Sequence, residues 1–221
     1  MLDRASIDAV VTDPPYASTG AASSFVTVDK VRGFPREYQF YEAWWREILA
    51  ELMRVLKPSG AIWMTIDWRG AMALDRASSK FPLSEPKIGV WHRGGLGMGH
   101  VLRNVYECFA VMTCSEWKRR KTDEPDVWSV KWTPSDRRMG HSAEKPIELM
   151  SKAIELLADP GSTILDPFAG SGTTAVACAM GGYNCIAIER EAEYVSIIAD
   201  RLADLGEHER PVTRDQVCLF G

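Results

Sequence analysis

The 221-residue sequence lacks paired cysteines, long apolar runs and an excess of positive charge. Its five cysteines form no Cys-x-x-Cys pair, and no histidine lies at zinc-ligand spacing from them, so we expect reduced thiols and no metal site. No apolar stretch approaches the ~18 residues that span a membrane, and the N-terminus has no signal-peptide pattern, which together predict a cytoplasmic protein. A net charge of −4 does not by itself indicate a nucleic-acid binder, so any such surface depends on how the charges are distributed.

Short apolar strands alternate with amphipathic helices along most of the chain. The expected strands cover 7–11, 61–66, 88–91, 105–113, 163–165 and 184–188, and the expected helices cover 41–56, 69–80, 144–158, 172–180 and 191–205. This alternation predicts one α/β domain over residues 1–221, with helices on both faces of its sheet. The strands at 88–91 and 105–113 have no helix between them, which indicates one antiparallel strand in an otherwise parallel sheet.

A glycine-rich turn follows the strand at 163–165 and opens the next helix. Its residues are Asp166, Pro167, Phe168, Ala169, Gly170, Ser171, Gly172, Thr173 and Thr174. Glycines let a ligand approach the backbone, and the free N–H groups of the helix favour an anion. The turn lacks the lysine of a phosphate-binding loop, whereas the methionine carboxylate of S-adenosylmethionine would suit it. Glu189 ends the next strand, where an acid would accept two ribose hydroxyls. The alternative is a tight strand–helix turn that binds nothing.

A second motif, Asp13-Pro14-Pro15-Tyr16, follows the first strand. An exocyclic base amine is a poor nucleophile because its lone pair is delocalised into the ring. The Asp13 carboxylate and the Pro14 carbonyl would accept its two N–H groups and localise that lone pair, and the carboxylate would stabilise the positive charge that develops. Pro15 presents no competing donor, and Tyr16 would stack on an extruded base. Asp-Pro-Pro also occurs in simple turns, which is the alternative.

Together the two motifs resemble those of the DNA amino-methyltransferases, whose signatures are Asp-Pro-Pro-Tyr and Phe-x-Gly-x-Gly. Their order here resembles the circularly permuted beta group of the N4/N6 family. The segment 141–146 resembles the family's His-Pro-x-(Gln/Glu)-Lys-Pro element, with Ser142 in place of its first proline. Segments 54–60 and 106–107 also resemble family landmarks, and the whole resemblance covers roughly residues 6–205.

The resemblance implies a Rossmann-like class I methyltransferase fold and direct transfer of a methyl group from S-adenosylmethionine to a base in DNA. It implies adenine N6 as the target, with cytosine N4 as the alternative, and cofactor contacts by His141 and Lys145. It also implies a bacterial or phage-like enzyme of the restriction–modification type. The family usually has a strand and a helix before Asp-Pro-Pro-Tyr, whereas only twelve residues precede Asp13, so an edge strand is missing, supplied by the tail or lost by truncation.

Two other function classes fit parts of this pattern. A methyltransferase acting on RNA or on a protein glutamine would keep the cofactor motif, but protein-glutamine enzymes carry asparagine at the position of Asp13. A non-catalytic, cofactor-binding partner subunit would not need Asp13, Tyr16 and the glycine-rich turn to be intact. The sequence therefore favours a catalytic DNA methyltransferase over both.

Residues 115–140 are polar and basic, contain tryptophans, and occupy the place of the family's variable target-recognition region. The expected DNA-binding residues are Lys118, Arg119, Arg120, Lys121, Arg137 and Arg138, because arginine and lysine contact phosphates and guanine edges. The segment is short, so a homodimer is expected if one copy is insufficient to grip duplex DNA. A solvated loop is the alternative interpretation of the same charges.

Two further segments lead to predictions. Residues 17–37 contain many Ser, Thr and Gly and predict a lid that becomes ordered when cofactor and DNA bind. The C-terminal Gln216-Val217-Cys218-Leu219-Phe220 is apolar for a chain end, which favours docking on the sheet in place of the missing edge strand. It also resembles the Gln-x-x-Leu-Phe peptide that holds the bacterial sliding clamp, with Gln216, Leu219 and Phe220 as the contacts.

Overall fold

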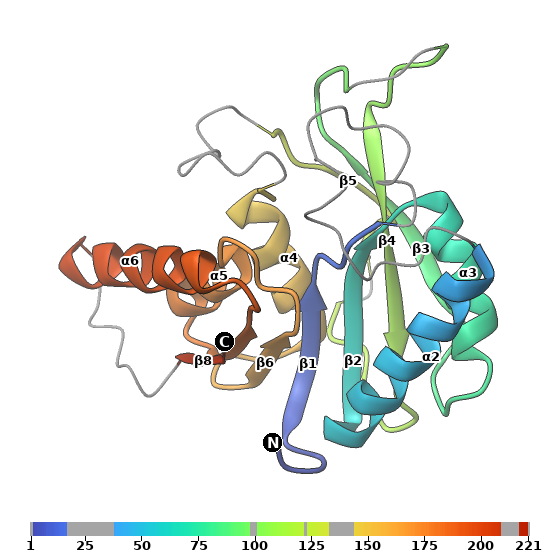
Figure 1. Cartoon of the computed structure of the whole chain (residues 1–221), viewed down its shortest axis with the longest axis horizontal. Coiled ribbons are helices and arrows are strands. Elements are labelled where there is room, and N and C mark those ends of the chain that lie inside the picture. Colours follow the sequence, from blue (N-terminus) through green and yellow to red (C-terminus); the bar gives the residue numbers. More distant parts are fainter. Residues whose placement is uncertain are drawn as a thin grey trace.

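An eight-stranded sheet forms the centre of the molecule (Figure 1). The computed structural model describes residues 2–16, 38–97, 101–121, 123–132, 144–208 and 217–220. In sheet order the strands are β5 (Val127–Ser129), β3 (Lys87–His92), β4 (Tyr106–Thr113), β2 (Leu56–Ile66), β1 (Ile7–Thr12), β6 (Thr163–Asp166), β7 (Asn184–Ile188) and β8 (Val217–Phe220). The described helices are α2 (Tyr38–Val55), α3 (Trp68–Ser78), α4 (Ile147–Leu157), α5 (Thr173–Gly181) and α6 (Ala192–His208).

The strands run in one direction except β4, which is antiparallel to both of its neighbours, β2 and β3. In Figure 1 the arrowheads of β1 and β2 accordingly point opposite to that of β4. The predicted α/β sheet with one antiparallel strand is therefore confirmed. We call the edge at which β1, β2 and β6 end the carboxyl edge, and the opposite edge the amino edge.

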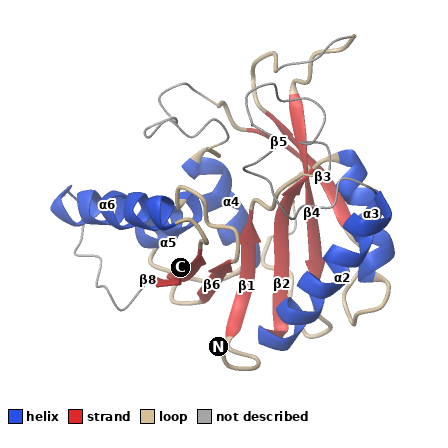
Figure 2. Ribbon diagram, in the orientation of Figure 1, coloured by secondary structure: helices blue, strands red, loops and turns tan. Residues whose placement is uncertain are grey.

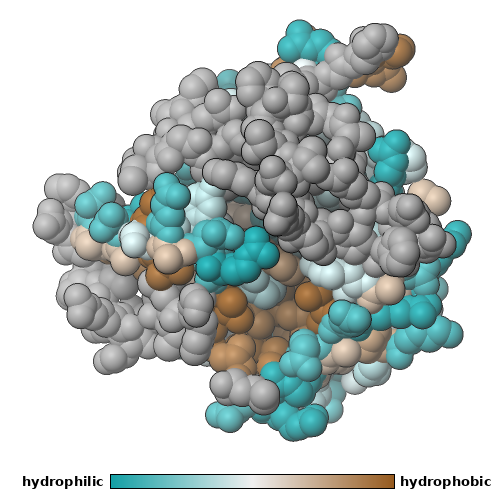
Figure 3. Space-filling view, viewed as in Figure 1, coloured by the Kyte–Doolittle hydropathy of each residue, from teal (hydrophilic) through white to brown (hydrophobic). Residues whose placement is uncertain are grey.

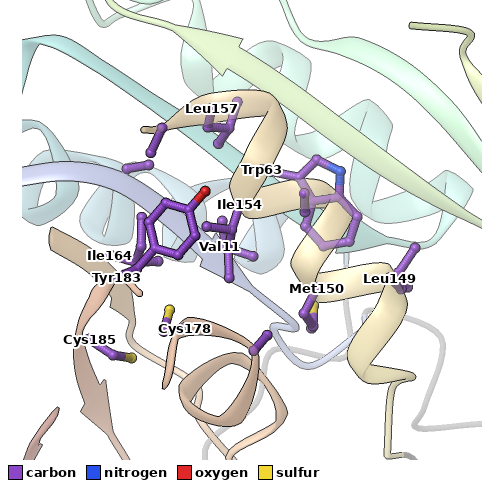
Figure 4. Packing of buried hydrophobic residues seen from close by; sticks show 14 of the residues in the cluster. Val11, Trp63, Leu149, Met150, Ile154, Leu157, Ile164, Cys178, Tyr183 and Cys185 are labelled. Carbon is purple, nitrogen blue, oxygen red and sulfur yellow. The ribbon is translucent and has the colours of Figure 1, made fainter. Parts of the chain in front are cut away.

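Apolar side chains alternate along the central strands and supply one core on each face of the sheet. Ala9, Val11 and Trp63 face the core beneath α4 and α5, whereas Val10 and Ile62 face the core beneath α2 and α3. Figure 2 shows these helices on the two sides of the sheet. Figure 4 shows the α4 side chains Leu149, Met150, Ile154 and Leu157 packed near Val11 and Trp63. Cys178 of α5 and Cys185 of β7 belong to the same cluster. Burying each large aliphatic side chain contributes about 1.5–3 kcal/mol, so this packing fixes α4 against the sheet.

One strand was not predicted from the sequence, and the start of another was predicted too late. β5 has three residues, too few to show a periodicity, yet its central Trp128 is buried and stacks on Trp63 with ring centroids 6.0 Å apart. β2 begins at Leu56, directly after α2. Its register on β1 shifts between Ile7 and Ala9, and this irregularity accommodates residues 57–60, which lie between the predicted helix at 41–56 and the predicted strand at 61–66.

The C-terminal tail completes one edge of the sheet. β8 pairs in parallel with β7, from Val217 opposite Cys185 to Phe220 opposite Ile188. The prediction that the tail docks on the sheet as an edge strand is confirmed. On the face shown in Figure 3, apolar residues gather at the surface between α2 and the end of β8. None of the helices in the described part of the chain is long and apolar enough to cross a membrane.

Candidate active site

The two sequence motifs meet at the carboxyl edge because β1 and β6 are neighbouring parallel strands. Asp13 directly follows β1, and Asp166 ends β6. The Thr12 hydroxyl donates a hydrogen bond of 2.6 Å to Asp166 Oδ1, which joins the last residues of the two strands. Ligands of open parallel sheets bind at such strand ends. The Asp-Pro-Pro-Tyr motif and the glycine-rich turn therefore lie side by side at the carboxyl edge.

The Asp13 carboxylate is held on both of its oxygens. Oδ1 accepts a hydrogen bond from the hydroxyl of Thr65 in β2. Oδ2 lies 2.7 Å from Lys145 Nζ, and the Lys145 side chain is only 8% exposed. The resemblance implied a cofactor contact for Lys145, whereas the structure places its ammonium on Asp13. This ion pair fixes the orientation of the carboxylate that would receive the target amine.

The backbone of the Asp-Pro-Pro-Tyr motif is fixed from α2. The Tyr41 hydroxyl donates a hydrogen bond of 2.7 Å to the Pro15 carbonyl. Pro14 is buried, whereas Asp13 and Tyr16 are half-buried. The motif therefore keeps its acidic and aromatic side chains at the edge of the site while a buried residue of α2 anchors its middle.

Tyr16 contacts a half-buried glutamate on β4. Its hydroxyl donates to Glu107 Oε2 at 2.7 Å, and Arg93 Nη1 lies 3.0 Å from Glu107 Oε1. Burial raises the pKa of Glu107, but the charges of Lys145 and Arg93 and the Tyr16 hydroxyl outweigh burial, so this pKa is lowered. Burial, with the charges of Asp13 and Glu107, raises the pKa of Tyr16, so its hydroxyl remains a donor at neutral pH.

The glycine-rich turn links β6 to α5, with two carboxylates beside it. Asp166 Oδ1 accepts from the Phe168 N–H at 3.0 Å, and burial raises the pKa of Asp166 to about 6. Glu189 Oε2 accepts from the Gly170 N–H at 2.8 Å. Gly172 has a φ of 85°, a left-handed conformation that favours glycine, and α5 begins at the next residue. Three hydroxyl residues of the turn are buried: Ser171, Thr173 and Thr174.

These residues fit S-adenosylmethionine. A Cβ added at Gly170 would meet no atom within 4 Å, so this part of the turn faces open space. Glu189 lies beside that space, since its Oε2 accepts from the Gly170 N–H, and a carboxylate at this position suits a ligand with ribose hydroxyls. Ala169 anchors the turn through its N–H, which donates to the Ile188 carbonyl at 3.0 Å.

A further buried ion pair supports the turn, and no role was predicted for it from the sequence. Arg201 Nη1 of α6 lies 2.6 Å from Glu144 Oε1 and donates to the Ser171 carbonyl at 2.8 Å. Glu144 sits inside the segment 141–146 that resembled a family element, which was the only signal for it. Among the residues that the structure describes, no group of three or more His, Cys, Asp or Glu is placed to hold a metal ion.

The basic run of residues 118–121 lies far from Asp13. The neighbouring Glu116 N–H donates to the Pro58 carbonyl, near the start of β2, which is at the amino edge. Arg120 lies 3.2 Å from Asp159, and Lys121 lies 3.4 Å from Glu155 near the end of α4. The structure therefore does not bring these residues together with the catalytic motif, because β4 carries the chain to the opposite edge. Three predicted residues, Arg137, Arg138 and His141, lie outside the described residues.

Comparison with known families identifies the family of the chain. The sequence model of the DNA methylase family, for N6 and N4 enzymes, matches residues 7–200. The chain belongs to this DNA methylase family, so the predicted enzyme class, an S-adenosylmethionine-dependent DNA methyltransferase, is confirmed. The chain is 27% identical to the type II methyltransferase M.HinfI of Haemophilus influenzae over 90% of its length, and it spans 64% of that protein. It is 28% identical to the type II methyltransferase M2.DpnII of Streptococcus pneumoniae over 89% of its length and spans 82% of that protein.

Two solved structures share the fold. The M1.HpyAVI–SAM complex superposes with a TM-score of 0.67 at 22% identity, covering 90% of each chain. The PvuII DNA methyltransferase, described as cytosine-N4-specific, superposes with a TM-score of 0.70 at 16% identity, covering 96% of this chain and 83% of that one. At these identities the likeness confirms the Rossmann-like fold of the class I DNA methyltransferases.

Proposed function

We propose that this protein transfers a methyl group from S-adenosylmethionine to N6 of an adenine extruded from duplex DNA. The observation that carries the proposal is the Thr12–Asp166 hydrogen bond of 2.6 Å, because it fixes the acceptor motif beside the cofactor turn. A methyl donor on the turn and an amine on Asp13 would then approach each other without a covalent enzyme intermediate.

Each side chain has a distinct task in this proposal. The cofactor, when bound, supplies a methyl group already activated on a sulfonium. Asp166 and Glu189 would hold its amine and its ribose hydroxyls. Asp13 and the Pro14 carbonyl would accept the two N–H groups of the base amine, and the Asp13 charge would stabilise the positive charge that develops on nitrogen. Tyr16 would stack on the extruded base.

Adenine N6 is favoured over cytosine N4 by the motif and not by the fold. The PvuII enzyme, described as cytosine-N4-specific, shares the fold, so the architecture accommodates either amine. Within the family that the chain resembles, Asp at the first motif position leans towards adenine, and Asp13 occupies that position here. Cytosine N4 is therefore the second candidate for the same chemistry.

The proposed partner is duplex DNA, in the setting of bacterial restriction–modification. A homodimer remains a proposal for gripping a site with a short recognition segment. Contact with a sliding clamp through Gln216, Leu219 and Phe220 is less favoured, because pairing of β8 with β7 already accounts for an apolar tail. Such a contact would require that β8 leave the sheet.

The test is transfer of a labelled methyl group to duplex DNA, RNA and protein in parallel, followed by sequencing of methylated DNA at single-base resolution. We expect incorporation into duplex DNA at adenine within one short sequence. Asp13→Ala is expected to bind S-adenosylmethionine but to keep less than about a tenth of the transfer rate. Asp75→Ala, at an exposed position on α3, is the matched control and should match wild type. Label in cytosine, in RNA or in protein, or an active Asp13→Ala variant, would contradict the proposal.

A further inference from the structure

Four charged side chains of alternating sign cross the active site. Arg93 Nη1 lies 3.0 Å from Glu107 Oε1, Lys145 Nζ lies 3.4 Å from Glu107 Oε2, and the same Nζ lies 2.7 Å from Asp13 Oδ2. Arg93 follows β3, Glu107 is on β4 and Asp13 follows β1, so the line of charges traverses the middle of the sheet. Lys145 enters from the segment before α4 and sits between the two carboxylates.

Both oxygens of Asp13 are engaged before any base arrives. Thr65 occupies Oδ1 and Lys145 occupies Oδ2, yet the target amine has to donate an N–H to the same carboxylate. The amine and the ammonium therefore compete for Oδ2. Lys145 is only 8% exposed, so its charge needs a carboxylate partner at every stage, since an unpaired buried charge is strongly unfavourable.

Glu107 is placed to provide that second partner. Its Oε2 lies 3.4 Å from Lys145 Nζ, so a small movement of the ammonium exchanges one carboxylate for the other without exposing the charge. Arg93 on Oε1 and the Tyr16 hydroxyl on Oε2 keep Glu107 in its charged form. The second contact also fixes the Tyr16 ring, against which the extruded base would stack, with Lys145 Nζ 5.2 Å from the ring centroid.

We propose that Glu107 is a positioning residue of methyl transfer: it takes up the Lys145 ammonium when the target amine engages Asp13, and it holds the Tyr16 ring. This proposal rests on the proposed function, because it assumes that an amine binds Asp13. Glu107 itself does not touch the reacting atoms. It acts through Lys145, which leaves Oδ2 available, and through Tyr16, which supports the base.

The first test is Glu107→Gln, which keeps the size of the side chain and removes its charge. We expect the single-turnover rate of methyl transfer to fall by about 10- to 100-fold, with the Kd for S-adenosylmethionine within about twofold of wild type. The matched control is Glu42→Gln on α2. Glu42 is 20% exposed, as Glu107 is, and pairs with Arg46 at 2.6 Å, so the control removes a similar ion pair elsewhere. Equal rates for wild type and Glu107→Gln would overturn the proposal.

A double-mutant cycle separates positioning from a general structural effect. In a Lys145→Met background, Glu107→Gln should lower the rate by less than about threefold further, because its partner has already gone. If the two substitutions lower the transfer rate by independent factors that multiply in the double variant, the proposed action through Lys145 is overturned. Tyr16→Phe supplies the second cycle, and coupling to it is expected as well.

A measurement on the DNA-free protein tests the same link without activity. The ammonium resonance of Lys145, assigned by its absence in Lys145→Met, should exchange slowly with solvent in wild type and faster in Glu107→Gln. Unchanged exchange would overturn the link between Glu107 and Lys145. If wild type transfers no methyl group to duplex DNA, the proposed function fails, while this measurement still decides whether Glu107 holds the ammonium.

Discussion

The Thr12 hydroxyl donates a hydrogen bond of 2.6 Å to Asp166 Oδ1 across 154 residues of sequence, and this contact joins the catalytic motif to the cofactor turn. Asp166 is buried, and burial raises its pKa to about 6 in spite of the donors from Thr12 and Phe168. An Asp that ionises this late in the folded protein links the stability of the turn to pH.

We predict that Asp166→Asn removes a pH dependence of stability. Because the folded pKa of about 6 lies above the unfolded value of 3.8, the stabilisation from protonated Asp166 is complete below pH 3.8 and is lost as pH rises to about 6. Asn does not titrate, so the Asp166→Asn variant lacks this loss. The difference in unfolding free energy, variant minus wild type, should therefore rise by about 3 kcal/mol as the pH increases across that window. Urea unfolding of both proteins at several pH values measures this difference. A difference that is flat with pH would show that Asp166 ionises normally.

We predict that Lys145→Met lowers the single-turnover rate of transfer to about a hundredth of the wild-type rate, which is still measurable, and destabilises the fold. The substitution leaves Asp13 and Glu107 without the ammonium that they share, and breaking a largely buried ion pair costs about 2–4 kcal/mol. Lys145→Arg keeps the charge and should be less destabilised, although a guanidinium is a poor geometric match for the same position. Denaturant unfolding and single-turnover kinetics report the two effects. A Lys145→Met variant that is as stable and as active as wild type would contradict a role for Lys145 in the site.

We predict that Gly172→Ala damages the cofactor turn by more than backbone strain. Gly172 has a φ of 85°, and an added Cβ would lie 2.7 Å from Ile198 Cγ1 on α6. Gly161 has a φ of 87° but open space around it, so Gly161→Ala isolates the strain of about 1–2 kcal/mol. The Gly172 variant should lose more unfolding free energy than the Gly161 variant and should alone weaken S-adenosylmethionine binding, as measured by calorimetry. Equal losses of unfolding free energy in the two variants would mean that α6 moves to make room for the added Cβ.

Most of the fold could be predicted from local patterns. β7 was predicted at its observed bounds, and α5 and α3 within two residues, because each is an apolar or amphipathic segment bounded by glycine or polar residues. β5 was not predicted, because three residues show no period and Trp128 is buried by aromatic contacts with Phe109 and Trp63. That packing depends on the tertiary arrangement, so no pattern in the neighbouring sequence indicates it.

The site was predictable only where it is contiguous in sequence. Asp13 and Asp166 stand in recognisable motifs, but Glu107 and Arg93 act through contacts with residues far away along the chain. The basic run at 118–121 shows the converse. Its charge suggested DNA, yet its place along the chain could not reveal that β4 carries it to the amino edge.

We predict that replacing Lys118, Arg119 and Arg120 by Ala leaves the salt dependence of DNA binding unchanged. If these residues bound DNA, as the sequence predicted, the slope would become flatter, because each lost phosphate contact reduces counterion release. The structure favours the opposite outcome, since Arg120 pairs with Asp159 at the edge away from Asp13. Arg137→Ala with Arg138→Ala is the comparison pair from the other part of the recognition segment. The measurement is DNA affinity from low to moderate salt concentration. A reduced salt slope in the triple variant would indicate that DNA contacts the amino edge.

We predict that deleting residues 216–221 lowers the melting temperature by about 2–6 °C, because it removes β8 and leaves β7 as an unpaired edge. Four residue pairs join these strands, so the loss should also appear as faster hydrogen exchange at Cys185 and Ala187, whereas central β1 should be unaffected. A tail that serves as a tether makes the reverse prediction: the deletion would leave stability unchanged and would abolish capture by a sliding clamp. A peptide of residues 214–221 tests that alternative directly. If the peptide binds the clamp and the truncated protein melts at the wild-type temperature, the pairing of β8 is not what retains the apolar tail.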